Sequence, residues 1–153
     1  MSAQPRYMAV QGAAILVAVV LTLIGVLGFI PGVTADLHEI AWVGSDSGAL
    51  LFGRFSASVV VNIVHIVVGL AGFAMARTYS SSRTYLLGGG VVYVGLGLYG
   101  MLADRADHVV PLNPAANWLH LILGVVLLLL AVTLAGQHDP TRRRRIHMRR
   151  AAT

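Results

Sequence analysis

The chain has 153 residues, of which 57% are hydrophobic and only 11% are charged, and its formal net charge is +5 at pH 7. A soluble domain carries about 25% charged residues, so this composition excludes an ordinary soluble domain and indicates a membrane protein. The absence of cysteine excludes disulfides, thiolate metal sites and cysteine catalysis. All 11 basic residues are arginine, and the wealth of alanine, glycine and valine suggests GC-rich coding and an actinobacterial-type host.

Four apolar segments are each long enough to cross a bilayer, which needs about 20 residues. They cover approximately residues 8–30, 55–76, 85–103 and 114–136. The first ends at Pro31, a helix-stop signal, and is too long for a cleavable signal peptide. Asn113 and Pro114 open the fourth as a helix cap and first helical position. The pattern predicts an all-α integral membrane protein, a four-helix bundle.

Arginine placement predicts how this bundle is oriented. The connection between the first and second segments holds one arginine, Arg54, and the connection between the third and fourth segments holds one, Arg105. On the opposite side of the membrane, the N-terminal residues hold Arg6, and Arg77 and Arg83 flank the connection between the second and third segments. The same side receives the arginines of the tail, namely Arg142, Arg143, Arg144, Arg145, Arg149 and Arg150. By the positive-inside rule both termini are cytoplasmic, in the cell inner (plasma) membrane.

The organisation along the chain is therefore a transmembrane domain over residues 1–140 and a flexible basic tail over residues 141–153. A basic cluster directly after a span binds anionic lipid headgroups, at about 1 kcal/mol per charge. We favour this interpretation over nucleic-acid binding. The longest connection, residues 31–54, contains Trp42, which with Trp118 fits the aromatic belt of the outer interface. Residues 36–43 of that loop could form a short surface helix.

One motif occurs twice inside the apolar segments. VNIVHIVVG and ANWLHLILG both read N-x-x-H-x-x-x-G, and a 55-residue offset aligns Asn62 with Asn117 and His65 with His120. Since the second and fourth segments run in the same direction, the chain could consist of two helical hairpins in tandem. At 100° per residue, each motif lies on one stripe of its helix, about 80° wide, which Ser58 also shares.

Small residues recur on corresponding stripes of all four segments. Such stripes let helix backbones approach closely in a membrane, so we expect them to face inward and the leucine and valine faces to meet lipid. The glycines predicted to pack between helices are Gly25, Gly28, Gly69, Gly72, Gly97, Gly100 and Gly124.

The asparagines and histidines of the two motifs are compatible with three roles. A polar group within a span normally faces the bundle interior and has a partner, so we first expect Asn62, His65, Asn117 and His120 to form a hydrogen-bonded cluster, which Tyr93 and Ser58 could join. Alternatively, the two histidines could ligate a haem iron or a metal ion. A third possibility is a small-molecule or proton pathway, although no carboxylate lies within the spans. No catalytic constellation is evident.

The sequence also resembles a known family. FGRFSASVVVNIVHIVVGLAGF, GVVYVGLGLYG and PLNPAANWLHLILGVVLLLL are similar to the domain of unknown function 4383 family, small four-span membrane proteins abundant in actinobacteria. Val61 and Ala116 depart from the family pattern, which often has histidine and an acid there. The resemblance implies a fold and a membrane setting without an activity. We therefore expect a non-enzymatic membrane protein without a cofactor, acting through helix or lipid contacts, with a membrane-protein partner or as a homo-oligomer.

Overall fold

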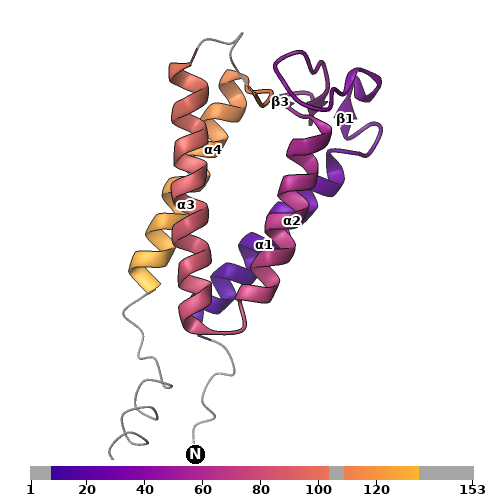
Figure 1. The fold of residues 1–153 in the computed structure, drawn as a ribbon. Coiled ribbons are helices and arrows are strands. Elements are labelled where there is room, and N and C mark those ends of the chain that lie inside the picture. The colour runs from indigo at the N-terminus through magenta and orange to yellow at the C-terminus, as the bar shows by residue number, and fades with distance from the viewer. Residues whose placement is uncertain (1–7, 104–108, 135–153) are drawn as a thin grey trace, which may run out of the picture.

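The structure, a computed structural model, describes residues 8–103 and 109–134. It is mostly helical (Figure 1), with helices α1 (Ala9–Leu27), α2 (Val59–Met75), α3 (Tyr79–Leu102) and α4 (Pro114–Thr133). The long connection between α1 and α2 holds strands β1 (Thr34–Ala35), β2 (Leu50–Leu51) and β3 (Phe55–Ser56) and the 3-10 helix η1 (Leu37–Glu39). The predicted arginine tail and the last residues of the fourth predicted span lie outside the described residues.

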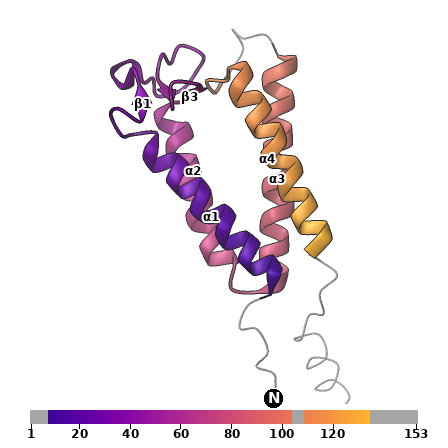
Figure 2. The ribbon, with the colours of Figure 1, turned by 180° about the vertical axis from the view of Figure 1, so that it is seen from behind.

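The helices form two antiparallel hairpins, α1 with α2 and α3 with α4. Figures 1 and 2 show from opposite sides that the hairpins approach each other at one end and diverge toward the other. We call the first the turn end, because residues 76–78 connect α2 to α3 there, and the second the loop end. The first residues of α1 and the last residues of α4 both lie at the turn end (Figure 1).

Three helices begin where a side chain caps them. The side-chain oxygens of Ser58, Thr78 and Asn113 accept hydrogen bonds from the backbone N–H three residues later, which satisfies one otherwise unpaired donor in each first turn. The second helix therefore starts at Val59, four residues after the start of the predicted span. The third starts at Tyr79, six residues before its predicted span.

Helices α1, α3 and α4, with 19, 24 and 20 residues, are long and apolar enough to cross a membrane, and α2 is an apolar helix of 17 residues. Large apolar side chains are exposed along all four. Leu16, Val67, Val91 and Val132, one from each helix, are 58–64% exposed. A soluble monomer rarely exposes an apolar surface of this extent, so the outer surface of the helices fits a membrane protein.

The loop between α1 and α2 is built differently from the expectation. Strands β1, β2 and β3 form a small antiparallel sheet in that order, with Thr34 opposite Leu51 and Leu50 opposite Ser56. The predicted short helix over residues 36–43 is reduced to the single turn of η1. Two-residue strands have no hydrophobic alternation to read, because a period of two needs several residues to become visible.

Candidate functional site

Within each hairpin the helices touch through the predicted glycines. A Cβ atom at Gly25 would lie 2.5 Å from the backbone oxygen of Asn62, and one at Gly124 would lie 2.5 Å from the backbone nitrogen of Val94. The other five glycines, Gly28, Gly69, Gly72, Gly97 and Gly100, also leave no room for a Cβ atom beside the neighbouring helix. By contrast, a Cβ atom at Gly12, Gly88 or Gly95 would meet nothing within 4 Å. Contact therefore separates the predicted glycines from Gly12, Gly88 and Gly95. Gly90 of α3, which is outside the predicted set, is also closely packed, since a Cβ atom there would lie 2.7 Å from Cγ of Leu128.

The two hairpins repeat the same contacts. Gly25 and Gly28 of α1 face Asn62 of α2, as Gly97 and Gly100 of α3 face Asn117 of α4. The offset is 72 residues between α1 and α3 and 55 residues between α2 and α4, where it also relates the capping residues Ser58 and Asn113. The hairpins are thus two versions of one packing unit.

Each asparagine belongs to its own hairpin. The side-chain amide of Asn117 donates a hydrogen bond of 2.6 Å to the backbone oxygen of Gly100, and the Asn62 side chain occupies the corresponding space beside Gly28. Ser58 is fully buried as the helix cap. No hydrogen bond among the described residues joins the asparagines to the histidines of the other span. The two motifs are therefore not joined by the expected hydrogen-bonded cluster.

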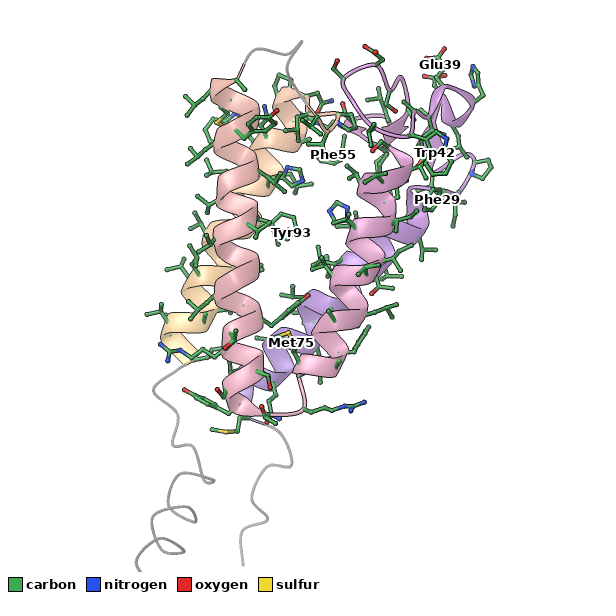
Figure 3. The ribbon with its side chains drawn as sticks, viewed as in Figure 1. Phe29, Glu39, Trp42, Phe55, Met75 and Tyr93 are labelled. Carbon is green, nitrogen blue, oxygen red and sulfur yellow. The ribbon has the colours of Figure 1, made fainter. Side chains whose placement is uncertain are left out.

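The histidines do meet, together with a tyrosine. The ring centroids of His65 and His120 are 6.5 Å apart, and Tyr93 lies 6.2 Å from the first and 5.6 Å from the second. All three distances are in the range of aromatic contacts. Figure 3 shows Tyr93 pointing from α3 into the space between the hairpins. We call these three residues the ring triad; it joins α2, α3 and α4.

The ring triad lines a cleft of about 350 Å³ between the hairpins. Its walls are mostly apolar. At the loop end it is lined by Leu51 of β2, Phe55 of β3 and Leu112, which lies in the segment before α4. Beyond the triad toward the turn end, the hairpins close on a buried core, in which Leu21, Leu86 and Leu127 are at most 1% exposed.

Three polar residues that contribute to this arrangement were not among the predicted site residues. The side-chain amide of Gln11 donates to the backbone oxygens of Ala76 and Arg77, both at 3.0 Å, which fixes the start of α1 to the end of α2. Tyr85 lines the cleft. The Asn113 amide donates to the Arg54 backbone oxygen at 2.8 Å, which connects the hairpins at the loop end. Gln11 and Tyr85 are polar residues on the inner faces of apolar helices. A polar residue within an apolar segment is visible in the sequence and is expected to face the interior.

Cofactor binding at this site would depend on the ring triad. The described residues contain no group of three or more histidine, cysteine, aspartate or glutamate side chains that could hold a metal ion. His65 and His120 come from different helices and so could supply two nitrogen ligands to one metal centre, as paired histidines do in helical bundles. A zinc or copper ion usually takes three or four ligands, so Tyr93 or an external group would have to complete the set.

A comparison with known families identifies the family to which the chain belongs. A family model described as Domain of unknown function (DUF4383) matches residues 11–133. The chain belongs to this family. The matched part of this DUF4383 protein runs from Gln11, which fixes the start of the first hairpin, to the end of α4. No curated protein and no solved structure matches the chain significantly.

Proposed function

We propose that this DUF4383 protein is a four-span protein of the plasma membrane, with both termini in the cytoplasm, that acts without catalysis as an accessory or structural membrane component. The observation that carries the proposal is the distribution of polarity over the four helices. Their exposed surfaces are apolar, and Arg83, in the first turns of α3, is the only Asp, Glu, Lys or Arg within them. Such surfaces interact with lipid or with other apolar helices.

The 17 residues of α2 span about 26 Å at 1.5 Å per residue. This is slightly less than the hydrocarbon core of about 30 Å. Local bilayer thinning accommodates a shortfall of this size at modest cost, and Phe55 of β3 and Ala57 add apolar residues before the helix. We therefore count α2 as the fourth span. The arginine tail would then lie at the cytoplasmic surface and bind anionic headgroups.

The proposed orientation predicts opposite labelling of two positions. The chain has no cysteine, so Asp46→Cys in the outer loop and Ser80→Cys near the α2–α3 turn each introduce a single reactive thiol. Both native side chains are exposed. In intact cells a membrane-impermeant maleimide should label Asp46→Cys, whereas Ser80→Cys should react only after permeabilisation. The reverse pattern would contradict the orientation.

Absorption spectroscopy tests the absence of a redox cofactor. We expect the detergent-purified native protein to show no Soret band, oxidised or reduced with dithionite, and no stoichiometric metal on elemental analysis. A Soret band that disappears in His65→Ala and His120→Ala would instead establish a haem protein. His38→Ala is the matched control, because His38 is exposed in the outer loop. Its spectrum should equal that of the native protein in either case.

A further inference from the structure

Three of the described residues that line the cleft between the hairpins carry a buried side-chain polar atom without a hydrogen-bond partner. One of these atoms, Nδ2 of Asn62, lies beside Gly28 of α1 within the first hairpin. The other two are Nδ1 of His120 and the hydroxyl oxygen of Tyr85, whose residues are only 8% and 7% exposed. Buried polar groups are nearly always hydrogen-bonded, and an unpaired one costs free energy. A phenol O–H donates, and an imidazole nitrogen donates in one of its tautomers. Both atoms can therefore be satisfied by acceptor oxygens of a bound molecule.

The charge and shape of the cleft restrict that molecule further. The lining residues that the structure describes include no aspartate, glutamate, lysine or arginine, so a charged group would be buried without a counter-charge. The rings of His65 and His120 are inclined by only 22°, and those of His65 and Tyr93 by 25°. Nearly parallel rings offer flat faces to a planar group. A neutral, planar molecule fits this environment.

The route into the cleft leads from the side. Val64 of α2 and Val92 of α3 line the cleft and are nevertheless 50% and 59% exposed, so the cleft opens on the lipid-facing surface. At the loop end two hydrogen bonds bridge the hairpins, from Gly44 N to the Val109 oxygen at 2.9 Å and from the Asn113 amide to the Arg54 oxygen. A molecule dissolved in the bilayer can reach the ring triad without crossing that region.

We propose that the cleft binds the head of a membrane-soluble quinone, that is, a neutral planar ring with carbonyl oxygens and an apolar chain. The carbonyls accept hydrogen bonds from His120 and Tyr85, the ring lies against the ring triad, and the chain leaves between Val64 and Val92 into the lipid. A volume of about 350 Å³ is at the small end of ligand pockets, which hold roughly 300–1,000 Å³. It suits a ring head better than a whole lipid. This inference rests on the proposed membrane location.

The test is binding of a decyl-substituted 1,4-naphthoquinone to the purified full-length protein in detergent, measured as a saturable rise in melting temperature. The absence of cysteine removes the usual side reaction of quinones with thiols. Decylnaphthalene, which has the same chain and ring system but no carbonyls, should bind at least about tenfold more weakly, the effect expected from one lost hydrogen bond. Equal binding of the two probes, or no saturable shift, would overturn the proposal.

Matched variants locate the site. Val92→Trp should block the lateral opening and weaken naphthoquinone binding about tenfold or more, whereas the neighbouring Val91→Trp should leave it unchanged, since Val91 is 64% exposed and does not line the cleft. Tyr85→Phe should weaken binding by about tenfold without a change of shape. If Val91→Trp and Val92→Trp behave alike, the site is not this cleft. Failure here would leave the maleimide labelling pattern, and with it the proposed topology, untouched.

Discussion

Replacing Gly25 by alanine should destabilise the protein by about 2–3 kcal/mol, near the upper end of the usual cost of overpacking. The added methyl group would lie 2.5 Å from the Asn62 backbone oxygen and 2.9 Å from the Ile66 backbone nitrogen. Backbone atoms within a helix cannot rotate away as a side chain does. The two helices must therefore separate, which weakens the contacts along the whole hairpin. The measurement is reversible unfolding by sodium dodecyl sulfate in mixed micelles, followed by tryptophan fluorescence.

The matched control is Gly12→Ala in the same helix. Gly12 is exposed, and a Cβ atom there would meet nothing within 4 Å. Alanine has the higher intrinsic helix propensity, by roughly 1 kcal/mol in water, so this variant should be as stable as the native protein or slightly more stable. Equal losses in both variants would show that loss of glycine itself, and not contact at Gly25, sets the stability of the hairpin.

The helices could be anticipated from the sequence because length and hydrophobicity alone restrict a bilayer-spanning segment to a helix. Where a helix begins depends also on its cap, and the predicted spans miss the start of α2 by four residues and that of α3 by six. The Asn113–Pro114 pair gave the start of α4 correctly. Ser58 was read as part of a polar stripe, although it is the N-cap of α2. The small sheet of β1, β2 and β3 depends on turns and on long-range pairing, which the sequences of two-residue strands do not encode locally.

The site was harder to anticipate, for a geometric reason. A stripe about 80° wide is broad enough to touch two neighbours at once. Asn62 and His65 share one stripe, yet Asn62 packs against Gly28 of its own hairpin, whereas His65 lies beside rings of the other. Spacing identifies residues on the same face, but it does not say which helix lies opposite each of them. Tyr93 was recognised as a possible member, and Tyr85 was missed because no motif includes it.

A second large effect is expected where the hairpins meet. Leu127 of α4 is 1% exposed within the core that joins them, whereas Leu129, two residues later, is 56% exposed. In a bilayer both side chains are surrounded by apolar groups, so the hydrophobic transfer term that operates in water hardly distinguishes them. What differs is packing. Leu127→Ala leaves a void whose lining loses its dispersion contacts, whereas lipid chains can fill the space left by Leu129→Ala.

We therefore expect Leu127→Ala to lower the free energy of unfolding by about 2 kcal/mol, the lower end of the range for buried leucines in soluble cores, where transfer from water adds to the cost. Leu129→Ala should change it by less than about 0.5 kcal/mol. The same unfolding assay in mixed micelles checks both. If Leu129→Ala proves as costly as Leu127→Ala, that face of α4 is packed against protein rather than lipid. The accessory role would then have its interface on the Leu129 side of α4, with a second copy or a partner helix.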